Sequence, residues 1–169
     1  MSKTKEVRLG IAGVGGMGSG HARSILAGNI RNLRLAAVCD TDTERLGSFS
    51  GDLLKFDSSA EMIRSGKIDA VLVATPHYFH TTVGIDALDN GLHVLLEKPI
   101  SVHKADCERL IAAYEKNKAR NLVFCAMFNQ RTTPVYQKLR NLVQQGDLGQ
   151  VTRVNWIITN WYRTQSYYN

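Results

Sequence analysis

Residues Leu9 to Gly18 read LGIAGVGGMG, an apolar run that ends in a Gly-x-Gly-x-x-Gly pattern formed by Gly13, Gly15 and Gly18. A buried strand, a tight turn and the start of a helix fit this order, and such a turn holds a pyrophosphate. The first glycine permits the turn, the second lets the backbone approach the phosphates, and the third lets helix and strand pack closely. The helix N-terminus adds N–H groups and a partial positive charge. Glycine-rich turns are common, so the pattern alone leaves a dinucleotide site undecided.

An acidic residue follows these glycines at the spacing of a dinucleotide site. Residues 33–39 form a predicted strand that stops at Asp40, 22 residues beyond Gly18. A carboxylate there binds adenosine ribose hydroxyls and repels a 2′-phosphate, so NAD is favoured over NADP. The same region offers a helix cap, with Thr41 and Glu44 as a capping box, and the two roles are compatible. The basic alternative, Arg45, is expected on the following helix.

Predicted strands and helices alternate six times along the chain. Strands are expected over residues 7–14, 33–39, 68–74, 92–96 and 122–126. Helices are expected over 17–27, 43–54, a short stretch after a capping box at Ser58 and Glu61, 77–90, 101–118 (capped by Ser101) and 134–145. Continuous apolar strands separated by helices predict an α/β protein with a doubly wound parallel sheet, the Rossmann fold.

Composition limits the class of protein. The 169 residues suffice for one domain with a hydrophobic core. No apolar run approaches the roughly 20 residues needed to cross a bilayer, and the polar start of the chain does not look like a signal peptide. Three widely spaced cysteines form neither a disulfide framework nor a metal-ligand cluster, so we expect a cytoplasmic protein without a metal site.

The net charge of +6 is distributed unevenly. Residues 1–96 hold ten lysines or arginines and ten acidic residues, whereas residues 97–169 hold eleven and five. The basic residues are scattered over predicted helical surfaces instead of forming a stripe with interleaved aromatics, so we expect no nucleic-acid partner. A solvated basic face, a nearby anionic ligand and an acidic partner segment remain open explanations of the excess.

Three loops at predicted strand ends carry polar residues that could perform chemistry. Residues 75–77 with His80 follow one strand, residues 97–99 the next, and residues 129–131 the last. The carboxyl ends of parallel strands meet at one edge of a sheet, where ligands bind. Ordinary loop polarity is the simpler explanation for any one loop, and a helix-face position is the simpler one for His80.

Together these motifs resemble the glucose–fructose oxidoreductase / inositol dehydrogenase (Gfo/Idh/MocA) family, and the resemblance spans essentially the whole chain. It is carried by the glycine turn, Cys39-Asp40, Ala74-Thr75-Pro76 with His80, Glu97-Lys98-Pro99 and Asn129-Gln130-Arg131. The Glu-Lys-Pro triplet after a strand is its most specific part, because glycines alone would not separate this family from other Rossmann proteins.

The resemblance implies a role for each matching residue. Lys98 would be the catalytic residue, lying beside the nicotinamide, bonding the substrate carbinol and assisting proton transfer. Glu97 would bind the nicotinamide ribose, and Pro99, often cis in such proteins, would turn Lys98 into the cleft. The expected NAD-binding residues are Gly13, Gly15, Gly16, Met17, Gly18, Asp40, Ala74, Thr75, Pro76, His80, Glu97, Lys98, Asn129 and Arg131.

The resemblance also implies a second domain, a mostly antiparallel sheet with substrate residues and a histidine as general acid/base. We expect residues 1–128 to form the NAD-binding domain, and 129–169 to form a linker helix and the first strand (149–159) of an incomplete substrate domain. Arg163 and Tyr167 lie in what resembles a substrate-cleft loop and join Lys98 as candidate substrate-binding residues. The expectation is a truncated fragment of a protein about twice as long, which would associate into homo-oligomers when complete.

The leading hypothesis is an NAD-dependent oxidoreductase that transfers a hydride between nicotinamide and a carbinol of a sugar, polyol or cyclitol. The fragment itself would bind the cofactor and turn over little substrate. Two alternatives stay open: an NAD-dependent glycoside hydrolase of the same family, and a non-catalytic dinucleotide-binding module. The identity of the substrate lies outside this sequence, because the resemblance places specificity in the second domain.

Overall fold

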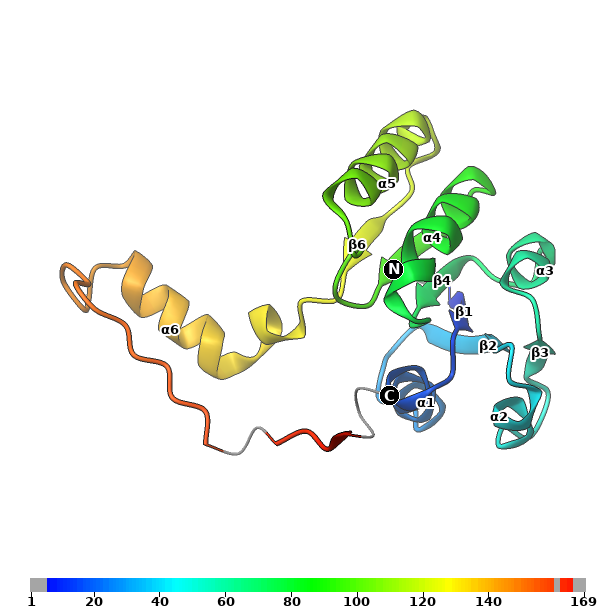
Figure 1. The fold of residues 1–169 in the computed structure, drawn as a ribbon, viewed down its shortest axis with the longest axis horizontal. Coiled ribbons are helices and arrows are strands. Elements are labelled where there is room, and N and C mark those ends of the chain that lie inside the picture. The colour runs from blue at the N-terminus through cyan, green and yellow to red at the C-terminus, as the bar shows by residue number, and fades with distance from the viewer. Residues whose placement is uncertain (1–5, 160–161, 166–169) are drawn as a thin grey trace, which may run out of the picture. The chain divides into compact units, whose positions relative to one another are not determined.

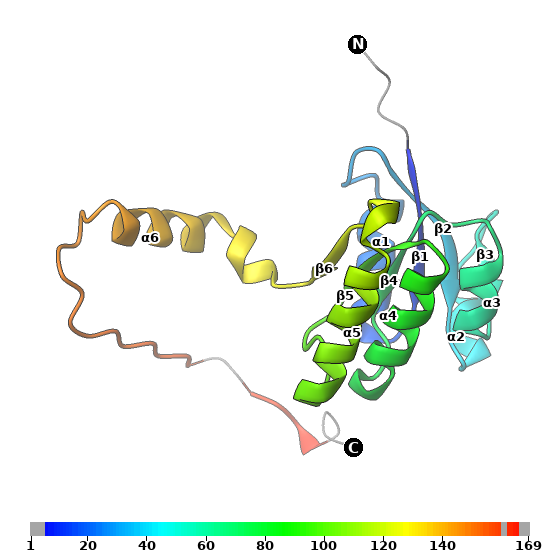
Figure 2. The ribbon, with the colours of Figure 1, turned by 90° about the horizontal axis from the view of Figure 1, so that it is seen from above.

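The computed structural model describes residues 6–159 and 162–165, and the chain divides into two compact units, residues 1–128 and 129–169. The first unit (Figure 1) holds a six-stranded, all-parallel sheet with strand order β3-β2-β1-β4-β5-β6, and Figure 2 labels all six strands. This is the doubly wound sheet that the sequence predicts, and the Rossmann fold is confirmed.

Strands and helices of the first unit alternate along the chain. The strands are β1 (Val7–Ala12), β2 (Leu33–Cys39), β3 (Leu54–Phe56), β4 (Ala70–Val73), β5 (His93–Leu96) and β6 (Phe124–Ala126). The helices are α1 (Gly16–Leu26), α2 (Thr43–Gly47), α3 (Ser59–Arg64), α4 (His80–Asp89) and α5 (Lys104–Lys116), with 3-10 turns η1 (His77–Phe79) and η2 (Lys118–Arg120). None of the described helices is long and apolar enough to cross a membrane.

The helices cover both faces of the sheet. Side chains of α1 and α2 (Ile25 and Leu46) belong to one buried cluster, and those of α3, α4 and α5 (Met62, Leu88 and Leu110) belong to another. Figure 2 shows α3, α4 and α5 in front of the strands and α1 behind them. The chain therefore leaves β1 toward one face and β4, its neighbour, toward the other. That arrangement is a topological switch point, where open α/β sheets bind ligands.

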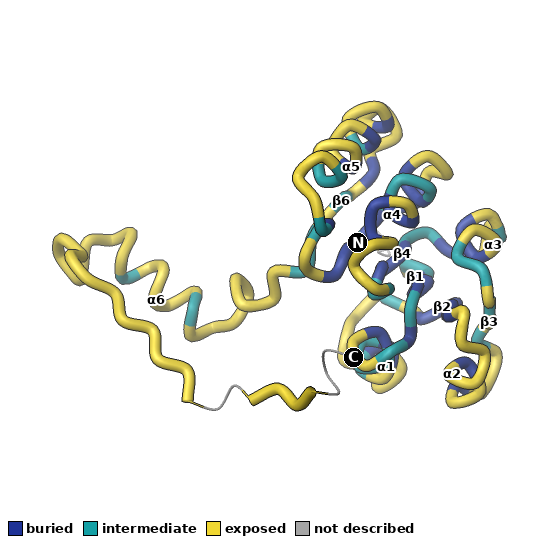
Figure 3. The backbone as a smooth tube through the Cα atoms, viewed as in Figure 1, coloured by how far each residue is buried: buried dark blue, intermediate teal, exposed yellow. Residues whose placement is uncertain are grey.

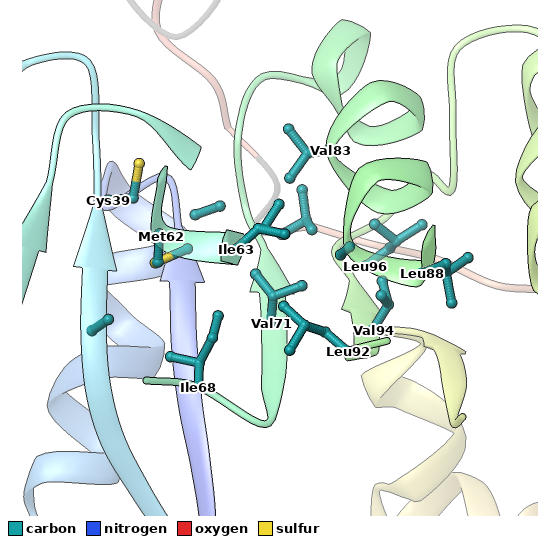
Figure 4. Close-up of a cluster of buried hydrophobic side chains, with 14 of the residues drawn as sticks. Cys39, Met62, Ile63, Ile68, Val71, Val83, Leu88, Leu92, Val94 and Leu96 are labelled. Atoms are coloured by element: carbon teal, nitrogen blue, oxygen red, sulfur yellow. The ribbon is translucent and has the colours of Figure 1, made fainter. Parts of the chain in front are cut away.

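The continuous apolar character of β1 follows from burial on both sides. Leu9 and Ile11 belong to the cluster with α1, whereas Ala12 belongs to the cluster with α4. The close-up in Figure 4 shows Val71 of β4 and Leu96 of β5 among the side chains of that second cluster. Each fully buried Leu, Ile or Val contributes roughly 1.5–3 kcal/mol to stability, so the two clusters hold the strand ends in place.

The helix predicted over residues 43–54 is wrong in its second half. Helix α2 ends at Gly47, and Leu54–Phe56 form strand β3, which pairs with β2 through Ala37–Cys39. Gly51 between them has a φ of +82°, a left-handed conformation that ends a helix and that glycine adopts readily. A three-residue strand is too short to show a period, so only its pairing with β2 reveals it.

Two of the three predicted helix caps are wrong. Asp42, and not Thr41, is the N-cap of α2, and its side chain accepts a hydrogen bond from the Glu44 N–H. Ser101 does not cap α5, which begins after His103; the Ser101 hydroxyl lies 2.7 Å from that of Thr81 in the protein interior. The third prediction is confirmed, since the Ser58 hydroxyl accepts from the Glu61 N–H at the start of α3.

The described residues of the second unit form the 3-10 turn η3 (Asn129–Thr132), helix α6 (Pro134–Gln144) and a segment without strand structure. Tyr136 of α6 stacks on Trp156 with ring centroids 5.5 Å apart. The strand predicted over residues 149–159 is wrong, because that segment holds no strand and every residue in it is exposed. A strand needs a hydrogen-bonded neighbour, and the described residues of this unit offer none.

Candidate functional site

The glycine turn after β1 is built from close backbone contacts. Gly13 has a φ of +88°, and a Cβ on it would lie 2.7 Å from the Ala74 carbonyl oxygen and the Thr75 nitrogen. A Cβ on Gly18 would overlap the Gly13 carbonyl oxygen. Only glycine fits at these two positions, and their close packing brings the loops after β1 and β4 together at the switch point.

Helix α1 begins directly after this turn and points its N-terminus at the carboxyl edge of the sheet. Its N-cap is Gly15, which supplies no capping side chain, and its first turn contains no acidic residue. Gly16 and Met17 are exposed at the helix start, and a Cβ on Gly16 would meet nothing within 4 Å. The turn therefore presents backbone and a helix N-terminus without competing carboxylates, which suits an anion.

Asp40 lies at the end of β2 with its carboxylate turned toward the glycine turn. One oxygen accepts from the Val14 N–H at 2.8 Å and the other from the Asp42 N–H at 3.0 Å. The side chain is only 8% exposed, so these two bonds offset much of the cost of burying its charge. The bond to Val14 joins the acidic residue directly to the turn.

Arg45 reaches the same place from α2. Its Nη1 lies 3.6 Å from Asp40 Oδ2 and its Nε 3.0 Å from Asp42 Oδ2. The same Nη1 would lie 3.6 Å from a Cβ on Gly15, so the guanidinium borders the glycine turn. The sequence places Arg45 on the helix correctly and does not reveal this reach, because the loop geometry determines it.

The thiol beside Asp40 is not a candidate nucleophile. Burial raises the pKa of Cys39 to about 12, and the nearby charge of Asp40 contributes to the shift. A thiol is reactive as a thiolate, so Cys39 is an inert part of the core. Among residues 6–159 and 162–165, no group of three or more His, Cys, Asp or Glu side chains could hold a metal ion.

The loop after β4 contributes Ala74, Thr75 and Pro76. The Ala74 N–H donates to the Ala12 carbonyl at 2.7 Å, which continues the pairing of β4 with β1 up to the glycine turn. The Thr75 hydroxyl oxygen is buried and has no hydrogen-bond partner among the described residues. A buried hydroxyl normally has a partner, so this one fits a ligand that brings a polar group to the switch point.

His80 is fully buried at the start of α4 and connects two loops. Its Nε2 lies 3.0 Å from the Thr75 carbonyl oxygen and its Nδ1 2.8 Å from the Pro99 carbonyl oxygen. Each ring nitrogen therefore faces a backbone carbonyl oxygen. The cofactor contact predicted for His80 would therefore be indirect, through the two loops that its side chain joins.

The loop after β5 carries the Glu-Lys-Pro triplet. The Glu97 side chain is 9% exposed; one carboxylate oxygen lies 2.6 Å from His21 Nε2, and the other accepts from the Lys98 N–H at 3.1 Å. The Lys98–Pro99 peptide bond is cis, as the resemblance implies. The Lys98 side chain is exposed, and its ammonium has no hydrogen-bond or ion-pair partner within the described part of the chain.

Sequence reasoning missed His21. It lies on α1, three residues beyond Gly18, and its contact with Glu97 joins residues 76 positions apart. A polar residue soon after the last glycine was the available signal, and it does not identify a partner on another strand. The glycine turn, Asp40, Thr75 and Glu97 are thus linked by hydrogen bonds or close packing along one edge of the sheet.

The remaining candidates lie in the second unit. Asn129 and Arg131 belong to the turn η3, where the Asn129 carbonyl accepts from the Thr132 hydroxyl at 2.7 Å. Arg163 is exposed, and its Nη1 donates to the Tyr162 carbonyl. Tyr167 lies outside the described residues. Lys98 belongs to the first unit, whereas these residues belong to the second. Their roles in cofactor or substrate binding therefore stay predictions.

Comparisons with known proteins agree with the fold. The family model described as an oxidoreductase family with an NAD-binding Rossmann fold (GFO_IDH_MocA) matches residues 7–125. Inositol 2-dehydrogenase 1 of Saccharopolyspora erythraea is 33% identical over 158 residues, which is 91% of this chain and 46% of that protein.

Solved structures of inositol dehydrogenases are similar to the chain as well. The scyllo-inositol dehydrogenase from Lactobacillus casei, with NAD(H) and scyllo-inositol bound, superposes with a TM-score of 0.81 at 30% identity, covering 88% of this chain and 44% of that one. For the myo-inositol 2-dehydrogenase from Lactobacillus plantarum the TM-score is 0.80 at 28% identity, with 87% and 43% covered. The chain spans less than half the length of these relatives.

Proposed function

The chain belongs to the Gfo/Idh/MocA oxidoreductase family, and from that premise we propose that it is the cofactor-binding part of an NAD-dependent oxidoreductase. The proposed reaction transfers a hydride between a carbinol carbon and the nicotinamide ring. One observation carries the proposal: the loops after β1, β2, β4 and β5 present the glycine turn, Asp40, Thr75 and Glu97-Lys98-Pro99 along one edge of the sheet.

Each part of the dinucleotide has a matching feature. The glycine turn and the N-terminus of α1 would hold the pyrophosphate. The Asp40 carboxylate would accept hydrogen bonds from the adenosine ribose, and its charge disfavours a 2′-phosphate, although Arg45 at 3.6 Å weakens that repulsion. The Thr75 hydroxyl, which has no hydrogen-bond partner in the described part of the chain, would bond the middle of the cofactor, and Glu97 would bond the nicotinamide ribose.

Lys98 would handle the proton of the reaction. Oxidation of a carbinol removes a hydride from carbon and a proton from oxygen, and bound NAD supplies the hydride acceptor. The Lys98 amine, unpartnered within the described residues, would bond the carbinol oxygen and assist the transfer of its proton. Once it carries that proton, the Lys98 ammonium would also stabilise negative charge on the reacting oxygen.

The substrate class we propose is a polyol or cyclitol. It is supported by the names of the similar proteins, which are inositol dehydrogenases, one of them solved with scyllo-inositol. We propose in addition that the second unit begins a substrate-binding domain, with Arg163 and Tyr167 as candidate substrate contacts. The second unit exposes apolar residues on α6, which suits a segment that packs on further structure.

A titration of the 169-residue chain with NAD and with NADP tests the cofactor assignment. We expect NAD to bind more tightly, and Asp40→Asn to reduce that preference by about tenfold, because the charge that repels the 2′-phosphate is removed. Asp52→Asn is the matched control, since this exposed aspartate precedes β3 and therefore lies at the opposite edge of the parallel sheet. Tighter binding of NADP than of NAD would overturn the role of Asp40.

The chemical role of Lys98 is tested in the whole protein. Lys98→Met is expected to lower kcat with myo- or scyllo-inositol by at least about a hundredfold while NAD affinity changes little. The sterically similar methionine keeps the stem of the side chain and removes the amine. Near-normal turnover in Lys98→Met would show that the proposed mechanism is wrong.

A further inference from the structure

We propose that His21 is a positioning residue: its hydrogen bond to Glu97 holds the Glu97-Lys98 segment in the geometry that receives the nicotinamide half of the cofactor. The proposal rests on the proposed function and assigns a role to a residue of the pyrophosphate-binding helix that touches no reacting atom. His21 would act on the ligand only through Glu97.

The contact joins two elements that are not neighbours in the sheet. His21 is on α1, which follows β1, whereas Glu97 follows β5, and β4 lies between these two strands. The Nε2–Oε1 distance is 2.6 Å, which is short for a bond between nitrogen and oxygen. Because a carboxylate in its ionised form only accepts, the imidazole donates from Nε2.

The Glu97 carboxylate is held at both oxygens and from its backbone. Oε2 accepts from the Lys98 N–H, and the Glu97 N–H donates to the Val73 carbonyl at 2.9 Å. A buried carboxylate oxygen needs a donor, and His21 is the one that the described residues supply to Oε1. Without it the carboxylate would turn toward water, and the Lys98 backbone bonded to its other oxygen would lose its anchor.

This role makes a prediction that a merely structural histidine does not. A defect in α1 itself would weaken every ligand that binds the glycine turn. A defect in the position of Glu97 and Lys98 would weaken only ligands that extend past the pyrophosphate. ADP ends at the pyrophosphate and NAD continues to the nicotinamide ribose, so the two ligands separate the explanations.

Two amide substitutions at the same position provide the experiment. In His21→Gln the side-chain N–H group can reach the place of Nε2, whereas in His21→Asn the amide is one bond too short. We expect His21→Asn to bind NAD about tenfold more weakly and ADP unchanged within about twofold, and His21→Gln to recover most of the NAD affinity. His103→Asn is the control, because His103 is exposed at the start of α5 and its side chain caps nothing.

A double-mutant cycle with Glu97→Gln checks that His21 acts through Glu97. In the Glu97→Gln background, His21→Asn is expected to change NAD affinity by less than about twofold. Equal losses for ADP and NAD, additive effects in the cycle, or full NAD affinity in His21→Asn would each overturn the inference and leave the proposed function standing. If the unsubstituted chain bound ADP and not NAD, or neither, the proposed function would fail and the inference with it.

Discussion

Helices α4 and α6 differ in a way that separates the two units of the chain. Six of the ten residues of α4 are buried, whereas none of the eleven residues of α6 is. Both helices carry regularly spaced apolar residues, yet Val135 of α6 is 71% exposed and Leu139 48% exposed. Figure 3 shows the contrast, with buried positions gathered on the sheet and its helices, and α6 coloured mostly as exposed.

This difference shows that a pattern of apolar residues predicts a helix but does not predict whether its apolar face is buried. The period of 3.6 residues predicts a helix and its apolar face in both units. Other segments have to cover that face, and among the described residues the first unit has segments that bury it, whereas α6 has no buried residue. Stability of the described chain should therefore come almost entirely from the first unit, and matched substitutions in the two units test this directly.

The largest difference in the free energy of unfolding is expected when leucine is replaced by alanine in a helix of each unit. Leu110 of α5 is fully buried and packs over Gly84 of α4, where a Cβ would lie 2.8 Å from the leucine. Leu110→Ala should lower the free energy of unfolding by about 4 kcal/mol, because it removes buried apolar surface and leaves a cavity. Leu139→Ala in α6 should change it by less than about 0.5 kcal/mol. Urea denaturation of both variants is the measurement, and comparable losses would show that α6 is covered.

A smaller loss in the free energy of unfolding is expected for a substitution at Gly18, where two backbone segments of the first unit are in contact. Gly18→Ala places a methyl group against the Gly13 carbonyl, so the start of α1 has to shift away from β1. We expect a loss of about 2 kcal/mol in the free energy of unfolding together with weaker NAD binding. Gly20→Ala on the same helix meets nothing within 4 Å and should stabilise the chain by up to about 1 kcal/mol. Unchanged stability in Gly18→Ala would mean that the close approach is not needed.

The parts of the fold that the sequence predicts are those set by local pattern. Continuous apolar runs locate five of the six strands, and the glycine turn and the Glu-Lys-Pro triplet locate two of the loops at the switch point. Strand β3 escapes prediction because its three residues acquire their conformation from pairing with β2. The strand predicted over residues 149–159 is wrong for the opposite reason. Its alternation of apolar and polar residues is typical of a strand, but no partner strand is described for it.

The residues of the candidate site also fall into those that the sequence predicts and those that it does not. Residues recognised by motif, such as Asp40 and Lys98, could be named from the sequence, because their spacing from the strands is local information. Partners that meet only after folding could not. His21 and Glu97 are 76 positions apart, and Arg45 reaches Asp40 through the shape of a loop. Residues that link segments are thus the ones that require a structure.

A third pair of variants compares a buried hydrogen bond of a threonine hydroxyl with an exposed one. The Thr81 hydroxyl lies 2.7 Å from that of Ser101 in the first unit, and the exposed Thr132 hydroxyl donates to the Asn129 carbonyl at the same distance in the second. Thr81→Val should cost about 1.5 kcal/mol, because the Ser101 hydroxyl is left buried without a partner. Thr132→Val should cost less than about 0.5 kcal/mol, since water replaces the lost bond. Equal values in urea denaturation would contradict the difference in burial between the units.

The smallest expected effect depends on pH. Hydrogen bonds from Asn117 at 2.9 Å and from Lys116 at 3.1 Å lower the pKa of Asp89. A pKa that is lower in the folded state stabilises the protein above the unfolded value of about 4, and this contribution disappears as pH falls through the folded value. Because Asp89 is exposed, solvent screens its charge and the contribution should stay below about 1 kcal/mol.

Asp89→Asn should therefore lower the free energy of unfolding slightly at neutral pH and by still less at acidic pH, where the carboxylate of the unsubstituted chain is protonated. Asp147→Asn is the matched control, because it is the acidic residue of the second unit and should leave the pH dependence of unfolding unchanged. Urea denaturation at neutral and at acidic pH measures both variants. An equal loss at the two pH values in Asp89→Asn would show that the asparagine disturbs packing and that the charge of Asp89 contributes nothing. A change in the pH dependence with Asp147→Asn would instead show that the second unit shares in the stability of the chain.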